Sequence, residues 1–303
     1  MPEVDEQSAV AAGLIMRHMT WHDLTRTRLG TIASLPPQAT MEMGHLELSY
    51  RIPKEYKDNF KNLKQSQMDD AIADLLSQLD KETLEEIGRD WAPLLDAMPS
   101  RSWRRMSPRV TRLIAWDTVF ANAKPETWKK LPPAALNKFP PEFFEKAPAY
   151  VIESISAESW AKTNARAFKV MSMEKFRKID WVYVSYLSRD ARIFNSLGAE
   201  RLQAIEWKEV IGQGSLSPNV VRDMRMSTLR NMPKEFWKAA TTAHLKEVEP
   251  GTFNKLPIAS LRAIGKGKFK KLGKRYMKAL DKDVRKIIMK RGGKRKRKGR
   301  RKN

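Results

Sequence analysis

Apolar and polar positions recur along this chain with a period of eight residues. The clearest stretch runs from Pro132 to Leu187 in seven consecutive blocks. Places five and eight lie three residues apart, which puts them on the same face of an α-helix. Each block therefore predicts a helix of about two turns with one buried stripe. The fifth place of the seven blocks holds Leu136, Phe144, Ile152, Trp160, Phe168, Phe176 and Val184.

The first three places of a block carry the signals of a helix start. Place one is usually Ser, Asn, Asp, Thr, Gly or Pro, place two is Pro in several blocks, and place three is often Glu. Ser and Asn cap helix N-termini, Pro fits the first helical position, and a carboxylate favours the positive end of the helix dipole. One continuous helix is excluded because Pro recurs too often. Helices this short are marginal alone, so we predict an all-α fold, an α-solenoid of very short helices that stack.

The repeat region spans residues 72–288 and holds about 26 eight-residue units. Insertions of three residues interrupt the pattern at 88–90 and at 214–216. A helical array bends most readily where its period is broken, so we expect bends at these two places.

The two ends of the chain do not follow the repeat. Residues 1–71 predict an N-terminal cap or docking extension, with a helix from Ala9 to Leu24 that Ser8 would cap. The stretch from Met41 to Ile52 reads as a short strand or an extended arm. Residues 289–303 predict a basic tail that is disordered when free, because residues 292–303 lack large apolar side chains.

Composition removes several classes of protein. The 303 residues include no cysteine, which excludes disulfides, thiolate metal sites and cysteine nucleophiles. No apolar run reaches the roughly 18 residues of a transmembrane helix. Residues 1–10 are acidic, unlike a signal or transit peptide. No phosphate-binding glycine loop, Ser/His/Asp set or carboxylate pair stands out, so we expect no enzyme activity, no cofactor, no small-molecule substrate and no membrane.

Positive charge is concentrated at the C-terminus. The net charge is +23, and residues 265–303 contribute 20 Lys or Arg against two Asp, a net +18. A polyanion binds such a segment by releasing condensed counterions, so we predict RNA as the partner. A nuclear localisation signal or a solvated tail are the alternatives. The predicted RNA-binding residues are Lys266, Lys268, Lys270, Lys271, Lys274, Arg275, Lys290, Arg291, Lys294, Arg295, Lys296, Arg297, Lys298, Arg300, Arg301 and Lys302.

Three weaker signals have competing structural interpretations. Lys and Arg recur at places six and seven and would form either a basic ladder or a solvated face. The aromatic residues at place five favour core over base stacking, whereas four tryptophans at places one or two are better stacking candidates: Trp91, Trp116, Trp181 and Trp207. His18 and His22 are four residues apart but lack the adjoining Glu of a zinc-protease motif, which argues against a metal site.

Four functions are weighed on these grounds. The favoured one is a structural RNA-binding protein, a component of a large ribonucleoprotein such as an organellar ribosome, with rRNA and neighbouring proteins as partners. The second is a helical-repeat RNA-processing or translation factor that binds single-stranded RNA, and the third is a protein–protein scaffold with a basic localisation signal. An enzyme ranks last. The mitochondrion is favoured over the nucleus, nucleolus or cytoplasm.

Overall fold

The chain folds into helices in every part that the structure describes. The computed structural model describes residues 6–19, 23, 26–28, 31, 34–35 and 64–289. Within these residues it contains helices and no strand, which confirms the all-α prediction. Two compact units divide the chain, Met1–Asp180 and Trp181–Asn303. The arm expected at 41–52 and the tail from 290 to 303 lie outside the described residues.

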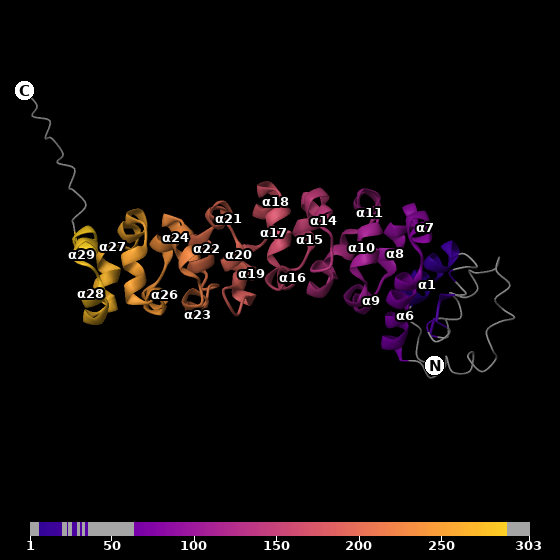
Figure 1. Cartoon of the computed structure of the whole chain (residues 1–303), viewed down its shortest axis with the longest axis horizontal. Helices are drawn as coiled ribbons and strands as arrows, with labels where there is room; N and C mark the ends of the chain where they lie inside the picture. The colour runs from indigo at the N-terminus through magenta and orange to yellow at the C-terminus, as the bar shows by residue number, and fades with distance from the viewer. Residues whose placement is uncertain are drawn as a thin grey trace, which may run out of the picture. The chain divides into compact units, whose positions relative to one another are not determined.

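Unit 1 begins with two longer helices, of 13 and 14 residues, and continues with short ones (Figure 1). Its described elements are α1 (Glu6–His18), α6 (Gln65–Gln78), α7 (Lys81–Glu86), η3 (Gly88–Asp90), α8 (Trp91–Ala97), α9 (Ser100–Arg105), α10 (Pro108–Leu113), α11 (Trp116–Asn122), α12 (Pro125–Lys129), α13 (Pro133–Leu136), α14 (Pro141–Lys146), α15 (Ala149–Ser154), α16 (Ala157–Ala161), α17 (Ala165–Val170) and α18 (Met173–Arg177).

Unit 2 continues the same design. Its described elements are α19 (Trp181–Leu187), α20 (Arg192–Ser196), α21 (Ala199–Ala204), α22 (Trp207–Gly212), α23 (Pro218–Arg222), α24 (Met226–Asn231), α25 (Lys234–Ala239), α26 (Thr242–Glu247), η4 (Pro250–Lys255), α27 (Ile258–Leu272), α28 (Lys274–Ala279) and α29 (Lys282–Met289). None of the described helices combines the length and apolarity needed to cross a bilayer.

The helix starts are where the sequence places them. Ser107, Ser156 and Ser172 each accept a hydrogen bond from the backbone N–H three residues later. Five helices, α10, α12, α13, α14 and α23, carry Pro in their first turn. These local signals stop each helix from merging with the one before it.

The buried stripe of each helix is wider than places five and eight. The place-five aromatics, Trp103, Trp128, Trp160 and Phe168 among them, are fully buried, which confirms their assignment to the core. Place four is buried too, as at Ser102, Phe143, Val151 and Ser159. Places four and eight are four residues apart and places five and eight three apart, so the three positions share one face.

Three local predictions are wrong. The helix α1 begins at Glu6, so Ser8 lies inside it, and the Ser8 hydroxyl donates to the Asp69 carboxylate at 3.1 Å instead of capping. The blocks drawn from Asp180 and Glu206 begin one residue too early, because Val184, Ser185 and Ser188 are buried in the first and Val210 and Ile211 in the second. In α29, place five holds the exposed Arg285, and Val284 at place four is buried instead; Ile288 at place eight is buried as predicted.

The helices also vary in length. The α6 helix runs for 14 residues, and α27 joins two blocks across Gly265, whose φ of 78° interrupts the helical geometry. A positive φ is open to glycine at little cost, so this glycine lets two blocks follow each other without a loop.

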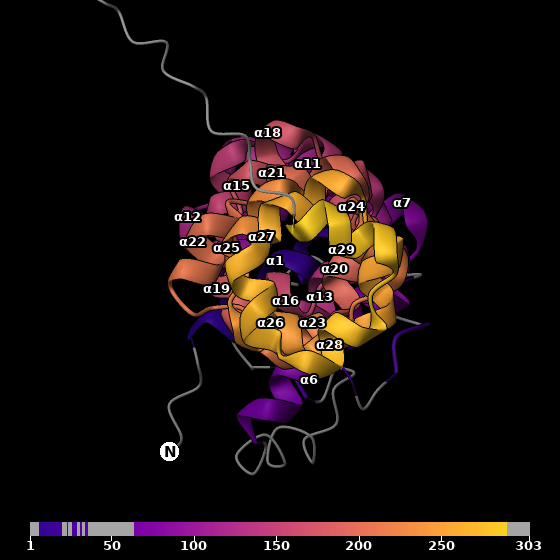
Figure 2. The same cartoon turned by 90° about the vertical axis from the view of Figure 1, so that its left-hand side faces the viewer.

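Within each unit, a helix packs against the third helix further along the chain. In unit 1, α6 contacts α9, α8 contacts α11, α12 contacts α15 and α14 contacts α17. In unit 2, α22 contacts α25, α23 contacts α26 and α25 contacts α27. Figure 2 looks at the C-terminal end of unit 2, with α22, α25 and α27 close together at the left and α23, α26 and α28 close together at the bottom. Each helix thus buries its stripe against helices of neighbouring layers.

Candidate nucleic-acid interface

Asparagine at place six joins each layer of helices to the next. In unit 1, the Asn137 amide donates to the Lys162 carbonyl at 3.2 Å and accepts from the Asn164 N–H at 2.7 Å. In unit 2, Asn254 bonds in the same way to the Ala279 carbonyl and the Asp281 N–H. The place-six side chain therefore points toward the loop that follows the third helix further along.

Other place-six residues repeat this contact. The Asn195 amide donates to the Asp223 carbonyl at 3.1 Å and accepts from the Arg225 N–H and the Thr228 hydroxyl, both at 2.8 Å. In unit 1, Asp96 accepts from the Lys124 N–H at 3.0 Å. The sequence analysis treated place six only as polar; the signal it missed was Asn or Asp directly after the place-five apolar residue.

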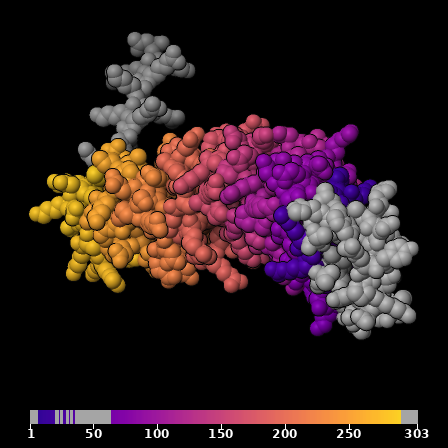
Figure 3. Space-filling model, turned by 45° about the vertical axis from the view of Figure 1, so that its right-hand side comes forward, coloured from indigo at the N-terminus to yellow at the C-terminus, as the bar shows by residue number. Residues whose placement is uncertain are grey.

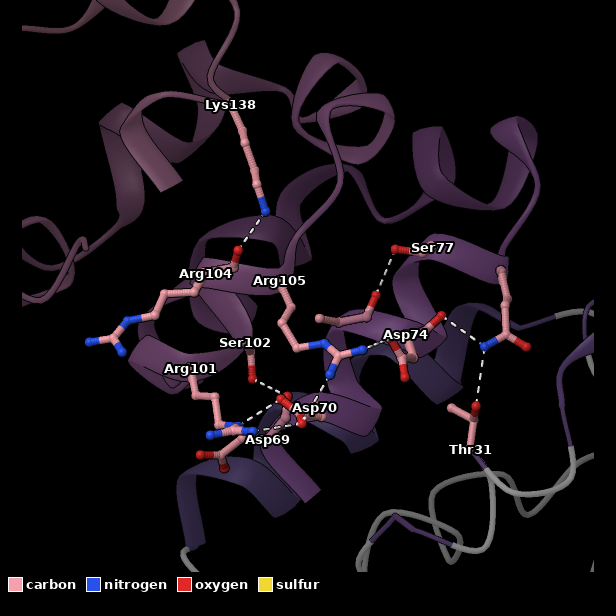
Figure 4. Close-up of polar contacts among 12 residues, drawn as sticks. Thr31, Asp69, Asp70, Asp74, Ser77, Arg101, Ser102, Arg104, Arg105 and Lys138 are labelled. Atoms are coloured by element: carbon pink, nitrogen blue, oxygen red, sulfur yellow. Dashed lines mark hydrogen bonds and ion pairs between the residues drawn. The ribbon is translucent and has the colours of Figure 1, made fainter. Parts of the chain in front are cut away.

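Twelve of the nineteen Lys and Arg residues from 64 to 180 do not stand alone, and the first group lies on α6 and α9. Figure 4 shows Arg101 and Arg105 of α9 converging on Asp70 of α6, with N–O distances of 2.7 and 3.0 Å. Arg105 also reaches Asp74 at 3.2 Å. The hydrogen bond from Arg101 and the positive charge of both arginines lower the pKa of the Asp70 carboxyl below its ordinary value.

Lysines of unit 1 bond to backbone carbonyls at the ends of earlier helices. Lys138 donates to the Arg104 carbonyl, Lys130 to the Asp96 carbonyl and Lys175 to the Glu145 carbonyl. Burial lowers the pKa of Lys138 and of Lys175. A cation near a helix C-terminus also offsets the negative end of the helix dipole.

The remaining lysines at places six and seven form ion pairs. Lys146 lies 2.7 Å from Asp117, Lys162 lies 2.7 Å from Glu158, and Lys178 lies 3.0 Å from Glu153. Exposed pairs of this kind contribute little stability, but they neutralise the surface. The basic ladder stays a prediction, and in unit 1 most of its members already have a partner.

The last three helices have a different charge balance. Residues 262–289 contain eleven Lys or Arg and two Asp, a net +9. Residues 181–261 contain eleven and eight, a net +3, and residues 64–180 contain nineteen and seventeen, a net +2. Figure 3 shows many long side chains projecting from these last helices, drawn in yellow.

Most of these cations have no partner. Among the described residues, eight of the eleven form no hydrogen bond or ion pair. They are Arg262, Lys266, Lys270, Lys271, Lys274, Arg275, Lys278 and Lys282. All are exposed except Lys266, which is half-buried. The structure thus brings five predicted site residues, those at 266, 270, 271, 274 and 275, into a group of three consecutive helices.

Lys268 is the exception among the predicted site residues of this region. Its ammonium donates to the Lys238 carbonyl at 2.6 Å and to the Ala240 carbonyl at 2.7 Å. Burial lowers its pKa. These two bonds join α27 to the C-terminal end of α25. They also occupy the Lys268 ammonium, which is therefore less available to a phosphate. The other ten predicted residues, from Lys290 to Lys302, lie outside the described residues.

Three further cations belong with this group and were missed. Arg262 and Lys278 occupy place six, as Lys270 does, and Lys282 begins α29. The signal in the sequence was the excess of Lys and Arg over Asp in residues 262–289, because place six is also basic in three earlier blocks, at Arg230, Lys238 and Lys246.

The other candidate sites predicted from the sequence have less support in the structure. The four tryptophans considered for stacking, Trp91, Trp116, Trp181 and Trp207, are at most 6% exposed and belong to the core. His18 lies 2.9 Å from Asp90, and the described residues contain no group of side chains that could hold a metal ion. Among the described residues, the most exposed aromatics are Tyr183 and Tyr186 of α19, at 54% and 67%.

The fold and surface define an all-α protein of short, layered helices with a basic C-terminal region. Comparison with protein-family models, curated proteins and solved structures gave no match.

Proposed function

We propose that this chain is a structural RNA-binding protein, a component of a large ribonucleoprotein such as an organellar ribosome. Its short helices would form a solenoid that serves as a scaffold, and its basic C-terminal region would bind rRNA. The observation that carries the proposal is the group of eight cations on α27–α29 that have no partner among the described residues. Cations that are free of internal partners remain available for phosphates, and each contact releases condensed counterions.

The contrast with unit 1 supports this assignment. There the place-seven lysines bond to carbonyls or carboxylates, so their charge stabilises layer contacts. A solvated basic face would also leave cations unpaired, but it would not require a net +9 in 28 consecutive residues (262–289). Like charges at such density repel one another, and a bound polyanion relieves that repulsion.

The solenoid is supported by the packing of each helix against the third one along within each unit. Repeat proteins of this kind bury a continuous core between layers and offer long surfaces to partners. The partners proposed are rRNA and neighbouring proteins, and the compartment proposed is the mitochondrion.

Sedimentation of the native protein through a sucrose gradient tests the proposal. The protein should migrate with large particles at two moderate salt concentrations and shift to a small species after RNase treatment. A small species that RNase does not affect would contradict RNA assembly and favour the scaffold. Retention in a large particle after RNase would identify a protein partner instead.

A further inference from the structure

Three place-six side chains near the end of unit 2 are cations. Asn195 and Asn254 show the direction of this position, because each bonds to the loop after the third helix further along. Arg262, Lys270 and Lys278 hold place six in α27 and α28. All three side chains are exposed and have no partner among the described residues, and Figure 2 shows α27 and α28, which carry them, at the end of unit 2 that faces the viewer.

This end surface has charge but no exposed aromatic ring among its described residues. Phe269 is fully buried, with its ring 5.3 Å from that of Phe253. The Tyr276 ring lies 6.3 Å from the Phe253 ring, and its hydroxyl donates to the Lys246 carbonyl. The exposed pair, Tyr183 and Tyr186, lies on α19, at the other end of unit 2 (Figure 1).

Single-stranded and double-stranded RNA need different surfaces. Proteins that bind single strands combine cations with aromatic rings on which bases stack. Double-stranded RNA keeps its bases stacked inside the helix and is recognised mostly by contacts to phosphates and 2′-hydroxyls. A surface of lysine and arginine without exposed aromatic rings fits double-stranded RNA.

We infer that the end surface formed by Arg262, Lys270, Lys278 and their neighbours on α27–α29 binds the sugar–phosphate backbone of double-stranded RNA. This inference rests on the proposed function and narrows it to one class of RNA. Binding is expected to tolerate any duplex sequence, because backbone contacts carry no base information.

The test compares a labelled RNA duplex with one of its own strands, using the full chain and a series of salt concentrations. The test variant is Arg262→Gln/Lys270→Gln/Lys278→Gln. The matched control is Arg230→Gln/Lys238→Gln/Lys246→Gln, which removes three exposed cations from place six of three earlier helices, α24, α25 and α26. Both variants change the net charge equally, and none of these six side chains has a partner in the described chain.

The wild type should bind the duplex more tightly than the strand. The test variant should lose about tenfold or more in duplex affinity, and its salt slope should fall by about 2.7, which is three phosphates at about 0.9 each. The control should change the slope by less than about 1. Amide exchange in the wild type should slow in α27–α29 when duplex is added.

Three results would overturn the inference. Equal losses in the test and control variants would mean that general charge, and not this surface, binds RNA. Tighter binding of the single strand, weakened by Tyr186→Ala, would assign recognition to stacking on α19 and leave the proposed function standing. Failure of the wild type to bind either RNA would remove both the inference and the proposed function.

Discussion

Phe143 tests whether the layers are packed as described. It holds place four of α14, a position that the eight-residue pattern does not mark as core, and it is fully buried. Its ring centroid lies 4.5 Å from that of Phe139, 4.7 Å from Trp116 and 5.4 Å from Phe120. Trp116 and Phe120 belong to α11, the third helix before α14, so this ring joins two layers.

Replacing Phe143 with Ala should strongly destabilise unit 1. Truncating a buried Phe costs about 3–5 kcal/mol, and aromatic pairs add about 0.5–1.5 kcal/mol beyond burial. Because the substitution removes several aromatic pairs at once, we expect the upper part of the range, about 4–5 kcal/mol. Each 1.4 kcal/mol is a factor of ten in an equilibrium constant, so amide protection in α11 and α14 should fall about a thousandfold or more.

The measurement is native-state amide hydrogen exchange, supported by thermal unfolding. Glu145→Ala is the matched control, because Glu145 is exposed on the same helix. That variant should stay within about 0.5 kcal/mol of the wild type. If Phe143→Ala cost less than about 1 kcal/mol, place four would not be core, and the packing of α14 on α11 would be refuted.

Three further outcomes are expected. Trp160→Ala or Phe168→Ala should each cost about 3–5 kcal/mol in urea unfolding, and unchanged stability would contradict the place-five core. Asn195→Ala should cost about 1–3 kcal/mol by stranding the Arg225 N–H, while the exposed Asn231→Ala should not; equal values would show that place six joins no layers. Arg101 and Arg105 lower the pKa of Asp70 in the folded chain. The ionised Asp70 therefore stabilises the fold above the unfolded-state pKa of about 3.9, and this stabilisation is lost as pH falls through the folded-state pKa. The stability gap between wild type and Asp70→Asn should therefore be present at pH 6 and close toward pH 2, and a gap that widened with acid would contradict the sign.

Much of the fold could be predicted from the sequence, because its signals act within single helices. Caps, first-turn prolines and the three-residue spacing of places five and eight act within a single helix, so the short helices and the burial of Trp103, Trp128 and Trp160 could be predicted. The concentration of cations near the C-terminus was equally visible, since charge can be counted along a chain.

The tertiary structure alone decided which helices meet and which cations stay free. Asn137 bonds 25 and 27 residues away, and Lys138 bonds to a carbonyl 34 residues away. An eight-residue period is compatible with several stacking partners, because it sets the buried face of a helix and not the helix that covers it. Place four is buried, and the place-seven lysines of unit 1 bond within the chain, because each helix contacts the third helix further along. The eight-residue period does not show this contact. At the end of unit 2, Arg262, Lys270 and Lys278 hold place six as Asn254 does, but they form no bond to another described residue, and their charge is left exposed.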